Sequence, residues 1–439
     1  MALSGIQIYK LLPQTNCKEC GFPTCLAFAM KLAAKQVELS GCPYVTEESK
    51  AQLAESAAPP IRLVSLKSNG YEVKAGNEVV LYRHEKTFYN RPGVFVKVKD
   101  DRPFEDLKAE IAKVAAFTVN YVGIDLEIDG FAIESVSGDS TKFTEAIGAV
   151  RAASQKPLIM ISLNPDVIAA GLRAVDGETP LVYGANVNNW EAMADLAKQH
   201  KAALAVIAES LEGLADLTEK IKGKGVEDLV LHPAGGGLSA ALTMNTQIRR
   251  LAIKKNFRPL GFPTMAFASV PASAAQAITK YCGFLVLDQF APELAYPTLV
   301  LRQNIYTDPQ KPIQVQPGLY EINNPKPEDA VLVTTNFSIT YFSVANEVEG
   351  SGLPAWLLVT DAEGMSVLTA WAAGKFDSER IAKSVKAFNV ADKVSRHRLV
   401  IPGAVAVLSG ELEGELPDWE IRVGPREAVD IPKFMKLAL

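Results

Sequence analysis

Residues 180–208 read PLVYGANVNNWEAMADLAKQHKAALAVIA and contain one complete repeat of the pattern that decides the fold. Two short apolar runs, PLVYGA (180–185) and ALAVIA (203–208), flank the amphipathic stretch NWEAMADLAKQH (189–200). Strands that are apolar almost throughout are typical of parallel sheets that are covered on both faces. The stretch therefore predicts a strand, a helix and a second strand parallel to the first.

The same alternation runs through the whole middle of the chain. Eight such units match the (β/α)₈, or TIM, barrel in number and in combined length. A preceding pair, GYEVKAG (70–76) and EVVLYRHEKTF (78–88), is expected to form a hairpin that covers the bottom of the barrel. The eight strand candidates are VFVKV (94–98), GFAIES (130–135), PLIMISL (157–163), PLVYGA (180–185), ALAVIA (203–208), DLVLH (228–232), PTMAFA (263–268) and GFLVLD (283–288).

Two proline-containing joints, SAAPPIR (56–62) and NNPKPED (323–329), separate this barrel from the segments on either side. The expected domains are therefore 1–58, 59–325 and 326–439, in an α/β multidomain protein. The last segment also alternates, and it predicts a small doubly wound α/β domain whose ligand lies beyond the carboxyl ends of its strands. Its strand candidates are AVLVTTNFS (330–338), AWLLVTDA (355–362), RLVIPG (398–403) and WEIRVG (419–424), and its helix candidates are SVLTAWAAGKF (366–376) and ERIAKSVKAF (379–388).

The composition restricts the class of protein. Apolar residues make up 48% and charged residues 22% of the chain, which is the balance of a soluble globular protein. The net charge is only −5 and there is no basic run, so nucleic acid is not an expected partner. The sequence shows neither a signal peptide nor an apolar stretch of the roughly 18–20 residues that span a bilayer. We expect a cytoplasmic protein that does not associate with membranes.

Four of the five cysteines are clustered near the N-terminus. Cys17, Cys20 and Cys25 lie in NCKECGFPTC (16–25), and Cys42 follows. In a reducing compartment such clustering indicates metal or redox chemistry more than disulfides. Four thiolates allow a zinc site or an iron–sulfur cluster. A structural zinc site usually has two CxxC pairs, whereas here the last cysteine stands alone before a proline. This pattern favours a [4Fe–4S] cluster, with zinc and unligated thiols as alternatives.

The stretch between the third and fourth of these cysteines, LAFAMKLAAKQVELS (26–40), reads as a helix. A single straight helix would carry the chain roughly 20 Å away, at about 1.5 Å per residue. The helix must therefore end early, and Gly41 should help the chain to return. The fifth cysteine, Cys282, is expected to be a buried core residue.

The order of these parts is similar to that of a known family. NCKECGFPTC followed by GCP (41–43), then a barrel, then a small α/β domain, resembles the large (gamma) subunit of the corrinoid/iron–sulfur protein of the acetyl-CoA decarbonylase/synthase system. The resemblance covers essentially the whole chain. It implies that Cys17, Cys20, Cys25 and Cys42 hold a [4Fe–4S] cluster and that the C-terminal domain holds a cobalt corrinoid of the cobalamin type.

The resemblance also implies a function. The protein would be a methyl carrier in the reductive acetyl-CoA (Wood–Ljungdahl) pathway, in which Co(I) takes a methyl group from methyltetrahydrofolate, a methyl-pterin, through a methyltransferase and passes it to acetyl-CoA synthase. The cluster would reduce Co(II) to Co(I). The implied partners are a small subunit in a heterodimer, the methyltransferase, acetyl-CoA synthase and a reductive activator. The chemistry takes place at cobalt, so no side chain is expected to be catalytic and the chain is a subunit of a methyltransferase system.

Two other functions stay open. Polar residues follow the barrel strands, where barrel enzymes have their active sites, so the barrel could itself be a methyltransferase that binds methyl-pterin. Alternatively, the chain could be an electron carrier that has the cluster and no corrinoid. The polar residues are Glu134, Asn164, Asn186, Asn188, Glu209, His232 and Asp288.

The cobalt is expected to lack a histidine ligand. Many corrinoid proteins supply one from a D-x-H-x-x-G motif. The only histidine of the third segment is His397, and Ser395 and Val400 stand where the motif would have Asp and Gly. We therefore expect a base-off corrinoid and read His397 as a surface residue.

Without a protein ligand to cobalt, the corrinoid must be bound through shape and hydrogen bonds. The candidate segments are 338–346, 367–376, 401–407 and 430–436, which supply hydroxyl groups, amides and small residues. The second could instead be an Ala-rich helix packed on its own sheet, and the third a plain tight turn. The candidate contacts are Thr340, Asn346, Thr369, Ala370, Trp371, Ala372, Ala373, Gly374, Gly403, Ala404 and Lys436.

Overall fold

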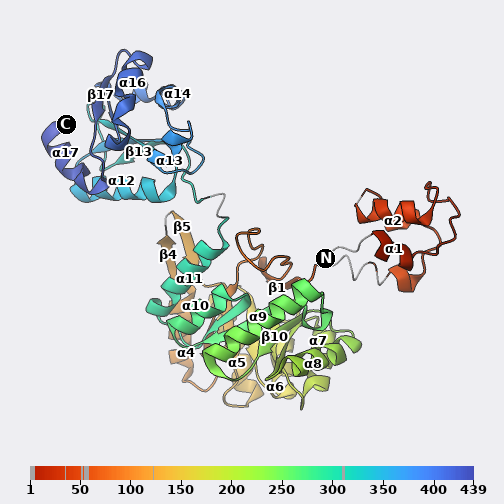
Figure 1. Cartoon of the computed structure of the whole chain (residues 1–439). Helices are drawn as coiled ribbons and strands as arrows, with labels where there is room; N and C mark the ends of the chain where they lie inside the picture. Colours follow the sequence, from red (N-terminus) through yellow and green to blue (C-terminus); the bar gives the residue numbers. More distant parts are fainter. Residues whose placement is uncertain (1–4, 35, 51–52, 54–58, 122, 309–311) are drawn as a thin grey trace. The chain divides into compact units, whose positions relative to one another are not determined.

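The structure is a computed structural model and describes residues 5–34, 36–50, 53, 59–121, 123–308 and 312–439. The chain divides into two compact units (Figure 1). The first comprises Met1–Val119 and Leu126–Tyr306, and the second comprises Asn120–Asp125 and Thr307–Leu439. The expected boundary after residue 58 lies outside the described residues.

The first unit contains a closed barrel of eight parallel strands, which confirms the prediction from the repeat. Neighbours pair in the order in which they occur in the chain, and the last strand pairs with the first, so no strand has a free edge. Alternate side chains fill the interior, among them Phe95, Ile159 and Phe284. The strands are β3 (Gly93–Lys99), β6 (Gly130–Glu134), β7 (Leu158–Ile161), β8 (Leu181–Ala185), β9 (Ala203–Ala208), β10 (Leu229–Pro233), β11 (Thr264–Ala268) and β12 (Cys282–Leu287).

A helix follows each barrel strand and packs its apolar stripe on the outside of the barrel. In α7 (Trp190–His200) the buried residues are Met193, Ala194 and Ala197, spaced as one face of a helix. Side-chain caps fix several starts, and Asp139, Asn164 and Ser210 each accept a hydrogen bond from a backbone N–H of the first turn. The other helices are α4 (Phe104–Ala115), α5 (Ser140–Ala153), α6 (Pro165–Ala174), α8 (Leu211–Gly223), α9 (Gly237–Lys255), α10 (Pro271–Thr279) and α11 (Pro292–Tyr306).

The hairpin over the amino end of the barrel is not the one expected. β1 (Val64–Ser68) pairs with β2 (Tyr71–Ala75) in antiparallel register, and residues 78–88 form no strand. The turn is Asn69–Gly70, with φ values of 43° and 88°, as a two-residue hairpin turn requires. Register then places Val64, Leu66 and Ala75 on the face that closes the barrel interior. The Asn-Gly signal, rather than the second apolar run, decides the pairing.

A second small hairpin interrupts the barrel between α4 and β6. It consists of β4 (Thr118–Tyr121) and β5 (Ile124–Glu127), and its residues 120–125 group with the second unit.

The second unit is the expected doubly wound domain. Its sheet has the order β13-β15-β14-β16-β17, in which the last four strands are parallel and β13 is an antiparallel edge strand. β13 precedes residue 326 and was not expected as part of this domain. The strands are β13 (Gly318–Ile322), β14 (Val331–Thr335), β15 (Ala355–Thr360), β16 (Arg398–Ile401) and β17 (Glu420–Val423).

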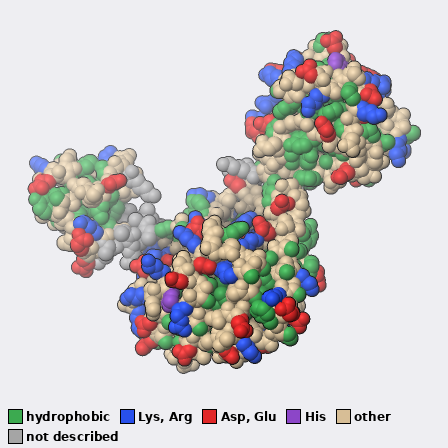
Figure 2. All heavy atoms as spheres, turned by 180° about the vertical axis from the view of Figure 1, so that it is seen from behind, with side chains coloured by type: hydrophobic (Ala, Val, Ile, Leu, Met, Phe, Trp, Pro, Cys, Tyr) green, Lys and Arg blue, Asp and Glu red, His purple; other side chains and the backbone are tan. Residues whose placement is uncertain are grey.

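Helices cover both faces of this sheet. On one face, α12 (Ser338–Ser351) and α17 (Ile431–Ala438) pack on Leu332, Leu357 and Val400. The opposite face is covered by α13 (Val367–Ala372), α14 (Ser378–Ala387), α15 (Val390–Lys393) and α16 (Ser409–Glu415). Figure 2 shows acidic and basic side chains interspersed over the visible surface of the units, in keeping with the small net charge.

The N-terminal segment is built on a small core of its own. α1 (Gly5–Leu11) packs against α2 (Cys25–Ala33), and a single 3₁₀ turn, η1 (Leu39–Gly41), precedes Cys42. Ile8 and Phe28 are buried between them. Because α2 ends at Ala33, the chain returns toward the first cysteines, as the sequence predicted.

We predict that the hairpin turn depends on glycine for conformation alone. A Cβ at Gly70 would meet no atom within 4 Å, but its φ of +88° is strained for other residues. Gly70→Ala should therefore lower the free energy of unfolding by about 1 kcal/mol. The matched control is Gly148→Ala in α5, where a Cβ also meets nothing. This substitution should raise stability by roughly 0.5–1 kcal/mol. Urea unfolding followed by circular dichroism measures both, and equal effects would contradict the assignment.

Candidate cofactor sites

The cysteine loop is held by hydrogen bonds between its two ends. The backbone N–H of Cys25 donates to Asn16 Oδ1 at 2.8 Å, and the backbone N–H of Asn16 approaches Cys25 Sγ at 3.4 Å. Thr24 Oγ1 caps α2 by accepting from the N–H of Ala27 at 3.1 Å. Asn16, Lys18 and Gly21 have φ values of 52°, 66° and 81°, so the backbone coils tightly between the first cysteines. The loop thus has a defined shape around its thiols.

The four thiols differ in their exposure. Cys25 and Cys42 are buried, Cys20 is half-buried and Cys17 is exposed. The two buried thiols belong to the same apolar core as Phe28. Thiolates are the ligands that iron–sulfur clusters use, and an apolar surround with limited solvent access is one of the features that set their potentials. The donor set and its surroundings fit a [4Fe–4S] cluster.

A single metal ion would need ligands that converge on one point. Among the described residues no group of three or more His, Cys, Asp or Glu side chains does so. A four-iron cluster binds its thiolates at the corners of a larger body, so it does not require the four sulfur atoms to converge on one point.

A wide pocket of the second unit lies at the carboxyl ends of β14 and β16. The chain passes from β14 to β15 on one side and then crosses to β16 on the other, so this is the point where strand order reverses. The pocket encloses about 1090 Å³, including the part that is open to solvent. Among the residues that line it are Thr334, Ile339, Thr340, Ser343, Val344, Leu368, Val400, Pro402, Ala404, Arg426 and Phe434.

A buried hydroxyl on the pocket wall lacks a partner. Thr334 is fully buried, and its Oγ1 makes no hydrogen bond in the structure. Ser338 Oγ, in the first turn of α12, is buried and unpaired as well. Buried hydroxyl groups normally have partners, so an unpaired one on a pocket wall is the feature that a polar group of a ligand would satisfy.

The mouth of this pocket carries an apolar rim. Ile339 and Leu368 line the pocket and are 58% and 54% exposed. Val407 in η3 (Gly403–Leu408) and Val429 in η4 (Ala428–Asp430) follow β16 and β17 and are about 70% exposed. Of these four residues, Ile339 and Leu368 form the apolar rim of the pocket, which suits a large flat ligand. Ile339, Leu368 and Val407 lie in the predicted segments 338–346, 367–376 and 401–407, although they are not among the predicted contacts.

The structure brings only part of the predicted corrinoid contacts to this pocket. Thr340 and Ala404 line it. Segment 338–346 lies in α12, and segment 369–372 lies in α13, as the helix candidate at 366–376 predicted. The other predicted residues, Asn346, Thr369, Ala370, Trp371, Ala372, Ala373, Gly374, Gly403 and Lys436, are not among the residues that line the pocket.

Several of these positions have another role in the fold. Ala370 is fully buried in the core beneath α13, as the alternative of an Ala-rich helix on its own sheet predicted. A Cβ at Gly403 would lie 2.4 Å from the carbonyl oxygen of Gly424, so this glycine allows two turns to pack closely. Asn346, Trp371 and Lys436 are exposed.

His397 lies at the amino ends of the strands, whereas the pocket lies at their carboxyl ends. It immediately precedes β16 and stacks on Trp419, with 4.8 Å between the ring centroids. It is therefore not in a position to reach a group held at the carboxyl ends of the strands.

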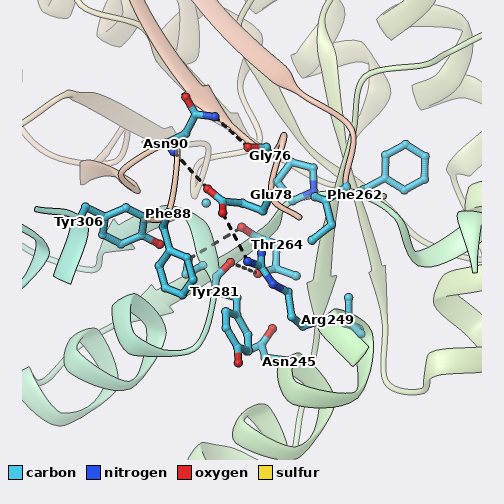
Figure 3. Close-up of a pocket in the computed structure, with 15 residues that line it drawn as sticks. Gly76, Glu78, Phe88, Asn90, Asn245, Arg249, Phe262, Thr264, Tyr281 and Tyr306 are labelled. Carbon is cyan, nitrogen blue, oxygen red and sulfur yellow. Dashed lines mark hydrogen bonds and ion pairs between the residues drawn. The ribbon is translucent and has the colours of Figure 1, made fainter. Parts of the chain in front are cut away.

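Glu78 and Arg249 form a buried ion pair at the amino end of the barrel (Figure 3). Arg249 also donates to the carbonyl of Val80, and Glu78 accepts from the N–H of Tyr89 at 2.7 Å. Burial raises the pKa of Glu78 even though Arg249 acts in the opposite direction. These contacts fix the irregular segment 78–90 against α9. The apolar run at 78–88 therefore forms part of this fixed irregular segment rather than a strand.

At the carboxyl end of the barrel an aromatic cluster faces the interior. The hydroxyl of Tyr183 and Nδ1 of His232 are 2.9 Å apart, and Phe267 packs against both rings. Burial lowers the pKa of His232 to about 4, so its imidazole is neutral at pH 7.

Comparison with known proteins agrees with these features. Residues 63–435 match the family described as CO dehydrogenase/acetyl-CoA synthase delta subunit, and residues 12–44 match a family described as a putative Fe-S cluster. The chain is 44% identical, over all of both sequences, to the corrinoid/iron-sulfur protein large subunit of Moorella thermoacetica. It is 35% identical to the acetyl-CoA decarbonylase/synthase complex subunit gamma of Archaeoglobus fulgidus, over 99% of this chain and 98% of the relative.

The chain thus belongs to a family of multidomain proteins in which a cysteine-rich segment precedes a TIM barrel and an α/β domain. That family is the corrinoid/iron–sulfur protein large subunits, or gamma subunits, of the acetyl-CoA decarbonylase/synthase system. Among solved structures, a dihydropteroate synthase from Xanthomonas albilineans is similar over 56% of this chain and 99% of its own, at 15% identity and a TM-score of 0.41. This last likeness says nothing about ligands.

No described helix has both the length and the apolar character that crossing a membrane requires.

We predict that His232 makes the barrel less stable in acid. Its pKa is about 4 in the folded protein and 6.5 as a free side chain, so below pH 6.5 only the unfolded chain takes up the proton. This contribution to stability is complete above pH 6.5 and is lost as the pH falls toward 4, by about 2 kcal/mol at pH 5. Urea unfolding at pH 7.5 and pH 5.0 should show a smaller pH effect for His232→Asn than for the native protein. An identical pH effect in both would contradict the assignment.

Proposed function

We propose that this protein is a corrinoid-dependent methyl carrier of the reductive acetyl-CoA (Wood–Ljungdahl) pathway. The observation that carries the proposal is the pocket at the carboxyl ends of β14 and β16, with its apolar rim and its unpaired Thr334 hydroxyl. It has the location in which doubly wound domains bind ligands. Its opening is wide and its walls are largely uncharged, which suits a macrocycle better than a small charged metabolite.

Cobalt, when the corrinoid is bound, supplies a Co(I) nucleophile that accepts and donates a methyl group. What the chain contributes is binding and shielding. The apolar rim would cover one face of the macrocycle. The pocket, which has Thr340 and Ala404 on its wall, would hold the nucleotide tail of the corrinoid. The Thr334 hydroxyl then gains the hydrogen-bond partner that it lacks.

The proposal includes a base-off corrinoid. His397 is the only histidine between residues 307 and 439, and it stacks on Trp419 at the amino ends of the strands, away from the pocket. A nitrogen ligand stabilises the higher oxidation states of cobalt, so its absence favours the reduced state that methyl transfer needs.

The second part of the proposal is that Cys17, Cys20, Cys25 and Cys42 hold a [4Fe–4S] cluster that reduces Co(II) to Co(I). The buried pair, Cys25 and Cys42, anchors the site to the core, while the exposure of Cys17 leaves one side accessible to an electron donor.

The proposed partners follow from the family. They are a small subunit that completes a heterodimer, a methyltetrahydrofolate:corrinoid methyltransferase, acetyl-CoA synthase and a reductive activator, in the cytoplasm. The rival functions, a barrel methyltransferase and an electron carrier without corrinoid, are distinguished by the visible spectrum of the purified protein, because corrinoid and cluster absorb at different wavelengths.

We predict that Cys42→Ala removes the cluster and leaves corrinoid binding intact. The variant should lose most of its iron and sulfide and should fail to return from Co(II) to Co(I) with a reductant that reactivates the native protein. The control is Cys282→Ala, which removes a thiol buried at the start of β12 and should leave the iron content unchanged. Stoichiometric zinc without sulfide in the native protein would rule out the cluster.

We predict that filling the pocket blocks the corrinoid. Ala404→Trp places an indole on the pocket wall and should weaken cobalamin binding by the full-length apoprotein at least tenfold, as measured by fluorescence quenching. The control, Ala373→Trp, adds the same group at an exposed position that does not line the pocket and should bind as the native protein does. The reverse pattern would place the corrinoid against residues 369–374.

A further inference from the structure

A layer of polar and aromatic side chains closes the carboxyl end of the barrel interior. Six of the eight strands contribute to it. Lys97 lies on β3, Tyr183 on β8, His232 on β10 and Phe267 on β11, while Glu134 ends β6 and Asp288 follows β12. We call these six residues the mouth layer. Below it the interior is apolar, with Phe95, Ile159 and Phe284.

An ion triad forms one half of the mouth layer. Lys97 Nζ lies 2.8 Å from Asp288 Oδ1 and 3.4 Å from Glu134 Oε2. The lysine side chain is 12% exposed, whereas the carboxylates are about 30% exposed. Burial alone would lower the pKa of Lys97, but the two carboxylates raise it, so the ammonium stays charged. With one cation between two anions, the triad carries a net charge of −1.

An aromatic wall forms the other half. The rings of Tyr183, His232 and Phe267 contact one another in edge-on or tilted geometry, with 5.1–5.4 Å between their centroids. Lys97 Nζ lies 5.6 Å from the centre of the Phe267 ring, so the triad and the wall touch. Val136, Leu163 and Val187 follow β6, β7 and β8 and are 49–70% exposed, so exposed apolar side chains are also present at this end of the barrel.

This arrangement is costly for a purely structural layer. A buried ion pair can usually be replaced by apolar residues without loss of stability, and branched apolar side chains fill the layers of most barrels. Charged groups at this end of a TIM barrel are typical of ligand binding, since the active sites of such enzymes lie here.

We propose that the mouth layer binds a small planar ligand with paired N–H donors, such as an aromatic amidine or an aminopyrimidine-type ring. Glu134 Oε1 and Asp288 Oδ2 have no protein partner in the described part of the chain and remain free to accept N–H groups. The net negative charge disfavours an anion. The three rings provide a surface for a flat ligand. This inference does not depend on the methyl-carrier function, because it concerns a different unit of the chain.

The test uses benzamidine and benzamide, which have the same shape but differ in charge and in their paired N–H donors. Calorimetry with the native full-length protein should show saturable one-site binding of benzamidine and at least tenfold weaker binding of benzamide. This comparison needs no variant, so a folding defect cannot obscure it. The absence of saturable benzamidine binding, or equal binding of the two compounds, would overturn the proposal.

Variants then locate the site. Asp288→Asn should weaken benzamidine binding at least tenfold, because the amide carries no charge and presents one oxygen in place of two. The matched control, Glu145→Gln, neutralises an exposed carboxylate on α5 and should leave binding unchanged. Native affinity in Asp288→Asn would show that benzamidine binds elsewhere.

Discussion

Parallel strands must be covered on both faces, and the rest of this structure depends on how each unit meets that requirement. The barrel meets it by closure, because pairing of β12 with β3 leaves no edge, helices cover the outside and alternate side chains fill the inside. The open sheet of the second unit needs helices on both faces, and it protects one edge with the antiparallel strand β13. Both solutions align the carboxyl ends of the strands, and both candidate ligand sites lie there.

The strand–helix alternation predicted the folds well because strands buried on both faces have a strong signature. Every barrel strand lies in a run that is apolar almost throughout, and so do β14, β15 and β16. The prediction failed where a local turn competes with hydrophobicity. Asn69 and Gly70 set the hairpin register, and the apolar run at 78–88 instead crosses the barrel floor, held by the Glu78–Arg249 pair. β13 was missed because its partly exposed residues have no continuous apolar run.

The candidate sites were predictable to different degrees. Cysteine spacing is a local property, so the four thiols and the early end of α2 followed from the sequence. The corrinoid contacts depend on which side chains of a helix face the sheet edge, and this is set by the packing of α12 and α13. Composition drew attention to small residues such as Ala370, which serve the core, whereas the pocket mouth is made by Ile339 and Leu368, whose exposure is evident only in three dimensions.

Because the four thiols are unequally buried, the two sides of the N-terminal segment are not equivalent for electron transfer. Cys25 and Cys42 are anchored in the apolar core, whereas Cys17 is exposed. Electron tunnelling weakens steeply with the thickness of intervening protein, so a redox centre held by these thiols would exchange electrons mainly through the side of Cys17. A donor and an acceptor of such a centre would therefore have to approach the same side and could not both occupy it at once.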